Sequence, residues 1–308
     1  MISIITPHFN DVDGIKGIYQ CLKRQSSNSW EWLIVDDLSD QSKKNALKEF
    51  VNSISGRQIK LILNAYKSNA SVCRNVGLDK SSYTNVVFLD SDDKLSSDFI
   101  ANRLIQVDEF VVFKNYEIVN ENGKQFSSKL FTKDPLDCFL NANFIWQTTC
   151  VLWNKEFLKH IGGFDPQLER LQDVELSIRA LFLGKNYRVL DNKTDFYYYT
   201  KPIRLKHDIV KKSCDSVSYL IEQINNNYTL SSYQKSLLPA YYFACVRCLP
   251  VSEKQKGIKY LKACLRIFYN TNFIDWKLVN IGELLLLIYG YGIISDSFFI
   301  KVNRYFFK

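Results

Sequence analysis

Short apolar runs alternate with amphipathic segments along the first ninety residues. The apolar runs are rich in β-branched and aromatic residues and predict buried strands at 2–6, 32–35, 59–63 and 86–89. Between them, apolar residues recur at helical spacing, as at Ile15, Ile18 and Leu22. This alternation predicts a doubly wound, mostly parallel α/β sheet, in which ligands bind at the carboxyl ends of the strands.

Acidic residues follow the fourth apolar run directly. Asp90, Asp92 and Asp93 fall within four positions at the predicted carboxyl end of that strand. Clustered carboxylate oxygens there suit a hard divalent cation that carries a phosphorylated ligand, although an acidic turn between strand and loop has the same composition. No glycine-rich phosphate loop follows the first strand, so a bound diphosphate would need another counter-charge, and a metal held by carboxylates is the usual one.

The alternation ends after residue 93. A strand is predicted at 111–113, and Asn122-Gly123 between two short apolar stretches predicts a β-hairpin. Further on, Asp173 falls in the first turn of a predicted helix whose apolar stripe is Val174, Ile178 and Leu181. The helix dipole favours an ionised acid at that position, so Asp173 is either a capping residue or a general base.

The last third of the chain, from residue 208 onward, is predicted to be helical and carries the basic excess. Residues 201–308 contain 16 Lys and Arg against 7 Asp and Glu, whereas residues 1–200 have a net charge of −1. Near the C-terminus, apolar residues fall close to one helical face beside basic ones: Ile293, Ile294, Phe298, Phe299 and Val302, with Lys301, Arg304 and Lys308. This pattern is typical of a helix that docks on an anionic membrane surface, and equally of one that packs on preceding helices or on a second subunit in a homodimer.

Composition excludes several classes of protein. With 308 residues, 46% apolar and 23% charged, the chain is typical of a globular protein, and its longest apolar run, 284–289, is far too short to span a membrane. The basic excess lacks a motif that reads nucleic acid, which argues against a nucleic-acid partner. Eight cysteines without framework spacing, and no signal peptide, predict a cytoplasmic protein. Cys245-Val246-Arg247-Cys248 has metal-site spacing, but without a second pair or a nearby His it is interpreted as helix packing.

Six short motifs follow one another in a characteristic order: Thr6-Pro7-His8-Phe9-Asn10, Val35-Asp36-Asp37, Cys73-Arg74-Asn75-Val76-Gly77-Leu78, Phe88-Leu89-Asp90-Ser91-Asp92-Asp93, Gly162-Gly163-Phe164-Asp165 and Gln172-Asp173. With them, the first two hundred residues resemble a family-2 glycosyltransferase of the A-type (GT-A) fold, of the kind that builds bacterial polysaccharides. The resemblance implies a catalytic domain at 1–203, with a nucleotide-binding half at 1–93 and an acceptor half at 94–203. The basic, aromatic-rich helical region at 204–308 then follows as an extension.

The resemblance implies a role for each matching residue of the nucleotide half. Thr6 and Pro7 would line the pocket for the base. Asp36 or Asp37 would accept a hydrogen bond from N3 of uracil; a polar loop start is the alternative for these two acids. Arg74 would approach the phosphates or the ribose, and its alternative is a surface cation on an exposed helix.

The acidic residues after the fourth strand would act as the DXD motif of the family. Asp90 would hold the ribose or a metal-bound water, and Asp92 would bind Mn²⁺ or Mg²⁺ between the diphosphate oxygens. Asp93 would be the third member of this group. Some members of the family close over the diphosphate with a later residue, so His207 would contact the metal or the phosphates.

Together these inferences predict an inverting, metal-dependent glycosyltransferase. It would move a hexose or an N-acetylhexosamine from a nucleotide-diphosphate donor, with UDP as the expected nucleotide, to a hydroxyl of a glycan or lipid-linked acceptor in surface polysaccharide synthesis. Asp173 would take the acceptor proton, although Gln172 stands where the family usually has Glu. Two alternatives stay open: a nucleotidyltransferase on a similar sheet, and an inactive interaction module that docks through its basic helices. If the C-terminal helix binds lipid, the protein would lie on the inner face of the cell membrane.

Overall fold

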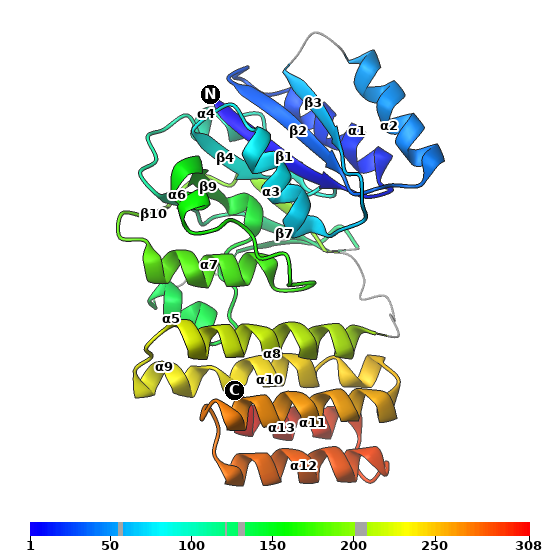
Figure 1. Cartoon of the computed structure of the whole chain (residues 1–308), viewed down its shortest axis with the longest axis vertical. Coiled ribbons are helices and arrows are strands. Elements are labelled where there is room, and N and C mark those ends of the chain that lie inside the picture. Colours follow the sequence, from blue (N-terminus) through cyan, green and yellow to red (C-terminus); the bar gives the residue numbers. More distant parts are fainter. Residues whose placement is uncertain (55–57, 121, 129–132, 201–207) are drawn as a thin grey trace. The chain divides into compact units, whose positions relative to one another are not determined.

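The computed structural model describes residues 1–54, 58–120, 122–128, 133–200 and 208–308 (Figure 1). Contacts divide the chain into two compact units. The sheet unit consists of Met1–Leu130, Ile145–Pro166 and Arg179–Pro202, and the helical unit of Phe131–Phe144, Gln167–Ile178 and Ile203–Lys308. The predicted domain boundary between residues 203 and 204 lies outside the described residues and stays a prediction.

A seven-stranded sheet forms the centre of the sheet unit. Its order is β10-β6-β9-β4-β1-β2-β3, and neighbouring strands are parallel except at β9, which runs antiparallel to β4 and β6. This arrangement confirms the predicted doubly wound, mostly parallel sheet. The strands are β1 (Ile2–His8), β2 (Trp30–Asp36), β3 (Ile59–Leu63), β4 (Asn85–Phe88), β6 (Phe110–Phe113), β9 (Val151–Asn154) and β10 (Arg188–Leu190).

Helices α1 (Val12–Lys23), α2 (Gln41–Ser53) and α3 (Ala70–Lys80) connect the first four strands (Figure 1). The shorter helices α4 (Phe99–Asn102) and α6 (Lys155–His160) occur later in the unit. Side-chain caps fix two helix starts, because Asp11 accepts a hydrogen bond from the backbone N–H of Gly14 and Asn69 accepts one from that of Val72. α1 begins only a few residues after β1, at the carboxyl edge of the sheet.

The parallel register brings several polar side chains to that edge. β1 ends at His8, directly opposite Asp36 of β2. The hydrogen-bond ladder continues past the strand ends, since the N–H of Asp37 donates to the carbonyl of His8 at 2.8 Å and the N–H of Leu89 donates to that of Ile5 at 2.9 Å. The acids that follow β2 and β4 are therefore attached to one rigid edge.

A smaller, four-stranded sheet in the order β5-β11-β7-β8 completes the sheet unit. The predicted hairpin is confirmed, because β7 and β8 pair antiparallel around Asn122-Gly123 and Gly123 has a φ of +74°, which favours glycine. The segment before β11 is anchored by a buried ion pair, with 2.8 Å between Nη1 of Arg103 and Oδ2 of Asp195. These strands are β5 (Lys94–Leu95), β7 (Glu117–Val119), β8 (Gln125–Ser127) and β11 (Phe196–Tyr199).

The helical unit confirms the predicted helical C-terminal region. α11 packs on α8 and α12, and α10 packs on α8 and α13. The apolar stripe of α8 is buried, at Val217, Leu220, Ile221 and Ile224. The helices are α5 (Pro135–Leu140), the first part of α7 (Gln172–Leu183), α8 (Ile209–Asn227), α9 (Ser232–Leu237), α10 (Pro239–Val246), α11 (Lys254–Asn270), α12 (Trp276–Gly290) and α13 (Asp296–Phe307).

The predicted apolar face near the C-terminus is divided between core and surface. Phe299 of α13 is fully buried and stacks on Tyr289 of α12, with 4.1 Å between ring centroids. Phe298 and Ile293, in contrast, are 51% and 70% exposed. The prediction of one common face was therefore wrong, because the adjacent Phe298 and Phe299 point about 100° apart and Ile293 precedes the helix. In the part of the chain that the structure describes, no helix is long and apolar enough to cross a membrane.

Candidate functional site

A pocket of about 290 Å³ opens at the carboxyl edge of the large sheet. The end of β1, the turn after β2, the start of α3 and the loop after β4 supply its walls. Its lining residues are Pro7, His8, Phe9, Asp37, Ala70, Cys73, Arg74, Asp90, Ser91 and Asp92. Five residues predicted from the sequence thus come together: Pro7, Asp37, Arg74, Asp90 and Asp92. Thr6, Asp36 and Asp93 do not line the pocket, and the hydroxyl of Thr6 instead accepts a hydrogen bond from Nε1 of Trp32 at 2.9 Å.

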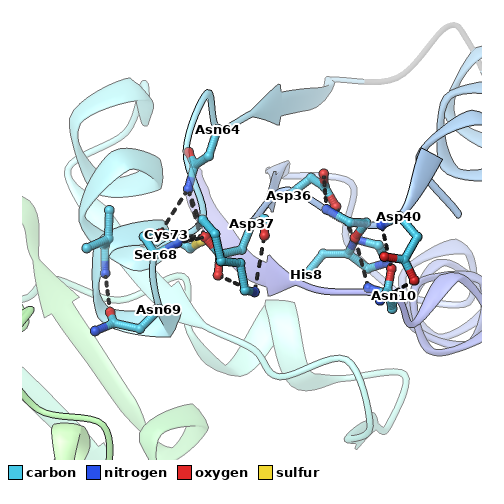
Figure 2. A network of polar contacts seen from close by, with 12 residues as sticks. His8, Asn10, Asp36, Asp37, Asp40, Asn64, Ser68, Asn69 and Cys73 are labelled. Atoms are coloured by element: carbon cyan, nitrogen blue, oxygen red, sulfur yellow. Dashed lines mark hydrogen bonds and ion pairs between the residues drawn. The ribbon is translucent and has the colours of Figure 1, made fainter.

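Asp36 is fully buried and belongs to the scaffold (Figure 2). Its carboxylate accepts hydrogen bonds from Nδ1 of His8 at 2.8 Å, from the Ser39 hydroxyl and from the Ser39 N–H at 3.1 Å. Nε2 of His8 accepts the N–H of Asp11 at 3.1 Å, which places the ring proton on Nδ1. Burial alone would raise the pKa of Asp36, but the hydrogen bonds from His8 and Ser39 outweigh it and hold the pKa below its usual range.

Asp37 faces the pocket and is held there as a carboxylate (Figure 2). It accepts hydrogen bonds from the N–H and the hydroxyl of Ser68, and from Nζ of Lys67 at 2.7 Å. Burial alone would raise the pKa of Asp37, but these bonds outweigh it and lower the pKa, so Asp37 is ionised at neutral pH. Lys67 also lies over the ring of Phe9, with Nζ 3.2 Å from the ring centroid. Burial raises the pKa of the neighbouring Cys73 to about 12, so this thiol is neutral.

Arg74 joins α3 to the acidic loop. It is 6% exposed, so it is not a surface cation, and its Nη2 donates to Oδ1 of Asp90 at 2.7 Å. The guanidinium also lies 5.0 Å from the ring centroid of Phe164, in the Gly-Gly-Phe-Asp motif. The Asp90 side chain remains 39% exposed. Arg74 and Asp90 therefore present one positive and one negative group side by side in the pocket wall.

The acidic loop is also tied to the start of α1. The hydroxyl of Ser91 donates to Oδ2 of Asp11 at 2.6 Å, while Oδ1 of Asp11 caps α1 at Gly14. A Cβ at Gly14 would lie only 2.6 Å from the carbonyl oxygen of Ser91, so glycine is needed for this close approach. One carboxylate thus fixes the position of the loop between Asp90 and Asp92.

Asp93 differs from the other two acids of its motif. It is 5% exposed, and its Oδ2 accepts a hydrogen bond from the hydroxyl of Thr149 at 3.3 Å. Its Oδ1 is buried and has no hydrogen-bond partner among the described residues. Burial, together with the charges of Asp90 and Asp92, raises the pKa of Asp93 well above its usual range.

The donor set of the pocket fits a hard divalent cation. Asp90 and Asp92 contribute carboxylate oxygens from the pocket wall. Mg²⁺ in such sites takes one or two carboxylates and completes its shell with phosphate oxygens and water. Within the described residues, no three acids of this region bring their oxygens within 4.8 Å of one another. His207, the other predicted ligand, lies outside the described residues.

Asp173 lies where the sequence predicts, in the first turn of α7. It is half-buried and belongs to the helical unit, together with Tyr241, whose pKa is raised by burial and by the charge of Asp173. Its backbone carbonyl accepts the hydroxyl of Ser177 at 2.7 Å. The side chain of Gln172 donates to the carbonyl of Leu168 at 2.8 Å, so Gln172 serves the turn before the helix.

Five described residues other than glycine have a left-handed backbone conformation, and three of them lie near the site motifs. Asn10 has a φ of +57°, Leu38 one of +58° and Leu171 one of +62°. Leu38 directly follows Asp37, and Leu171 lies two residues before Asp173. Residues other than glycine adopt this conformation at a cost of roughly 1–3 kcal/mol, and such strain is concentrated at functional sites.

Sequence reasoning missed the residues that hold these groups in place. His8 orients Asp36, Asp11 orients Ser91, and Lys67 pairs with Asp37. The sequence does point to His8 and Asp11, because both lie shortly after the strand predicted at 2–6. Nothing in the sequence around Lys67 indicates that this lysine contacts Asp37, which lies thirty residues earlier in the chain.

A family comparison adds a further observation. The family model described as Glycosyl transferase family 2 matches residues 3–160, which is just over half of the chain. This stretch contains every residue of the pocket lining.

Individual proteins resemble the chain over different lengths. It is 26% identical over 293 residues to the amylovoran biosynthesis glycosyltransferase AmsB of Erwinia amylovora, covering 88% of this chain and 91% of that protein. It is 33% identical over 130 residues to the UDP-Glc:alpha-D-GlcNAc-diphosphoundecaprenol beta-1,3-glucosyltransferase WfgD of Escherichia coli, covering 40% of this chain and 48% of that protein.

Solved structures share the fold at lower identity. The structure of S. aureus TarS 1–349 in complex with UDP-GlcNAc superimposes with a TM-score of 0.62 at 16% identity, covering 98% of this chain and 90% of that one. The mannosyltransferase PcManGT of Pyrobaculum calidifontis, in complex with GDP-Man and Mn²⁺, gives 0.58 at 14% identity, covering 99% and 84%.

Proposed function

Because the chain belongs to glycosyl transferase family 2 and is a glycosyltransferase, we propose that it moves a sugar from a UDP-sugar to a hydroxyl group, with inversion at the anomeric carbon. The acceptor is a glycan or a lipid-linked glycan in the synthesis of a bacterial surface polysaccharide. The observation that carries the proposal is the pocket at the carboxyl edge of the sheet. For the base, the pocket offers the ionised Asp37 beside the aromatic ring of Phe9. For the diphosphate end, it offers the guanidinium of Arg74 and the carboxylates of Asp90 and Asp92.

Asp37 is the residue that reads the base. It is an ionised acceptor in the pocket wall, and it would accept the N3–H of uracil. Asp37 lines the pocket, whereas Asp36 is fully buried and does not, which favours Asp37 over its neighbour. Phe9 is 49% exposed at the pocket and offers a ring face to the base, with Pro7 on the same strand end.

Arg74, Asp90 and Asp92 hold the diphosphate end of the donor. The guanidinium of Arg74 contacts phosphate or ribose oxygens, and its ion pair with Asp90 positions it for this. Asp90 and Asp92 would hold Mn²⁺ or Mg²⁺, which neutralises the charge that develops on the departing diphosphate. Asp93, which is buried behind the pocket, supports the loop through Thr149 and is not proposed as a ligand.

Asp173 is proposed as the general base. It accepts the proton of the acceptor hydroxyl while the oxygen forms a bond to the anomeric carbon, and the bond from that carbon to the diphosphate oxygen breaks. UDP leaves with the electron pair of that bond. The helix dipole favours a negative charge in the first turn of α7, where Asp173 lies.

The relatives support the donor and acceptor classes to different degrees. WfgD is named for a UDP-glucose donor and a diphosphoundecaprenol acceptor, and AmsB for amylovoran biosynthesis. TarS binds UDP-GlcNAc, whereas PcManGT binds GDP-Man with Mn²⁺. Since the fold accommodates both nucleotides, the proposal of UDP depends on Asp37 rather than on the fold.

The helical unit is proposed to dock on the cytoplasmic face of an anionic membrane, where a lipid-linked acceptor would lie. Tyr291, Ile293, Phe298 and Tyr305 are each more than half exposed, and residues 201–308 carry a net charge of +9. Co-sedimentation with anionic and neutral vesicles at low salt tests this. If the protein stays in the supernatant with both, and sedimentation equilibrium shows a dimer, the exposed aromatics form a subunit interface instead.

A nucleotide-release assay tests the activity. The full chain is incubated with UDP-glucose, UDP-GlcNAc and GDP-mannose, each with Mn²⁺, with Mg²⁺ or with chelator. We expect metal-dependent release of UDP from a UDP-sugar and none of GDP. A nucleotidyltransferase would instead release pyrophosphate from UTP and a sugar phosphate, and an inactive interaction module would release nothing under any of these conditions.

A further inference from the structure

Five of the eight cysteines lie in the helical unit, and four of them are on α8, α10 and α11 or in the turn after α10. The thiols of Cys214 on α8, Cys245 on α10 and Cys264 on α11 lie within 4.8 Å of one another. All three side chains are buried, with exposed fractions of 2%, 0% and 1%. The helices that carry them pack against one another pairwise (Figure 1). No other group of three His, Cys, Asp or Glu ligand atoms in the described chain comes this close together.

A buried polar group without a partner lies beside the thiols. The hydroxyl of Tyr242 is fully buried and makes no hydrogen bond to any described residue. Tyr242 precedes Cys245 by three residues on α10, so the two side chains lie on the same face of that helix. Buried hydroxyls usually have a hydrogen-bond partner, so this one is available to a group bound beside it.

The spacing of Cys245 and Cys248 is also that of two ligands to one metal ion. Two cysteines three residues apart lie on one face of a helical turn and form half of a common zinc motif. In the sequence this half-motif has no second pair, but the fold supplies Cys214 and Cys264 from other helices. Cys248 is partly exposed, and its Sγ lies 3.8 Å from the hydroxyl of Ser213, next to Cys214 in the chain.

We propose that Cys214, Cys245 and Cys264 bind a thiophilic metal ion, with Zn²⁺ the expected ion and Cys248 the candidate for a fourth ligand. Soft thiolate ligands select such ions, and ligands from three helices make a structural site rather than a catalytic one. If the thiols only packed as small apolar groups, the buried hydroxyl of Tyr242 would have no hydrogen-bond partner among the described residues. A disulfide between any two of the thiols would leave the third unused.

Binding has a definite chemical balance. Each thiol that becomes a ligand loses its proton to solvent, so affinity increases with pH. Once thiolates form, the Tyr242 hydroxyl can donate to one of the sulfurs, and it thereby acts as a positioning group in the second shell.

Metal content of the intact protein is the first test. The full chain and its Cys264→Ser variant are purified without chelator, and zinc is measured by mass spectrometry. We expect about one zinc ion per wild-type chain and background in the variant. Cys138→Ser is the matched control, because Cys138 is also buried in the helical unit but lies outside the cluster, and it should retain the zinc. Wild-type protein without zinc that also fails to take up added Zn²⁺ or Co²⁺ overturns the proposal.

A second measurement covers the case in which Cys264→Ser fails to fold. Wild-type protein is alkylated under native conditions with and without chelator. We expect chelator to expose the cluster cysteines to alkylation and to lower the melting temperature. Equal labelling with a full count of free thiols contradicts a metal site, and the loss of two thiols that reappear on reduction reveals a disulfide, which also contradicts it.

Two further variants separate the ligands from their surroundings. Cys248→Ser should change the visible spectrum of bound Co²⁺ if Cys248 is the fourth ligand. Tyr242→Phe should retain the metal with an affinity weaker by roughly 10–100-fold, the usual effect of removing a second-shell hydrogen bond. Neither variant touches the pocket of the sheet unit, so transfer activity is expected to respond to these changes only through stability.

Discussion

The pocket of the sheet unit and the thiol cluster of the helical unit are assembled in opposite ways. In the pocket, each polar group follows directly from the end of a strand or the start of a helix, so short sequence motifs carry most of the information. In the thiol cluster, single cysteines 19 to 50 positions apart converge only because three helices pack together. Local motifs therefore reveal a site when one sheet edge organises it, and miss a site that depends on helix packing.

The largest expected effect tests whether the chemistry needs a group outside the sheet-edge pocket. Asp173→Asn should lower turnover by about 10²–10⁴-fold, the range for loss of a general base, and leave the affinity for the donor nearly unchanged. Glu175→Gln, in the same helical turn, is the control and should retain activity. Steady-state kinetics together with donor titration measure both quantities. Unchanged turnover in Asp173→Asn would reduce this acid to a helix cap.

The next prediction concerns the acidic loop. Asp92→Asn should abolish the metal-dependent part of donor binding and lower transfer by about 10²–10³-fold, because it removes a charge that holds the cation. Calorimetric titration with a UDP-sugar, with and without Mn²⁺, gives the metal-dependent part directly. Asp79→Asn is the control, since Asp79 is an exposed acid of α3 that pairs with Lys159 away from the pocket. If the Asp92 variant still shows the full effect of Mn²⁺, the metal lies elsewhere.

A smaller effect separates two adjacent acids within the pocket region. Asp37→Asn should weaken UDP binding by roughly tenfold, since replacing a charged acceptor by a neutral one costs about 1.4 kcal/mol. Asp36→Asn should instead lower the melting temperature and change UDP affinity little, because its partners are His8 and Ser39. Titration with UDP and GDP, alongside thermal unfolding, checks the pair. Equal losses of UDP affinity in both variants would contradict the assignment.

The smallest effect tests the attachment of the loop. Ser91→Ala removes the hydrogen bond to Asp11 and should raise the KM for the donor by about 3–10-fold, which corresponds to roughly 1 kcal/mol. Ser91→Thr keeps the hydroxyl and should stay close to wild type. A double-mutant cycle with Asp11→Asn measures the coupling directly. Additive effects in that cycle would show that the two side chains act independently.

The fold and much of the pocket could be predicted because strand ends carry their own signals. The apolar runs before Asp37 and Asp90 fixed which acids reach the sheet edge. The choice between Asp36 and Asp37 could not be made, since both follow a strand buried on both faces and only the positions of Lys67, Ser68 and His8 distinguish them.

The C-terminal helix shows a different limit. Its buried stripe is Phe299, Asn303 and Phe307, at spacings of four residues. The buried Asn303 interrupts the apolar pattern of this stripe. Hydrophobic periodicity therefore places the exposed Phe298 and Ile293 on one face with the buried Phe299. A polar residue whose amide bonds to its own helix, as Asn303 does to the carbonyl of Phe299 at 2.9 Å, hides a core position from hydrophobic periodicity.

The hydrogen bond from Ser91 to Asp11 has a consequence for engineering this enzyme. The middle residue of an Asp-Xaa-Asp sequence is commonly treated as a free position when mutant libraries are drawn up. Here its hydroxyl secures the loop to the first helix, and the tight fit over Gly14 leaves no room for a bulkier attachment. Libraries intended to broaden donor choice should therefore keep Ser or Thr at position 91 and vary Phe9 and Ala70, which line the same cavity without supporting the loop.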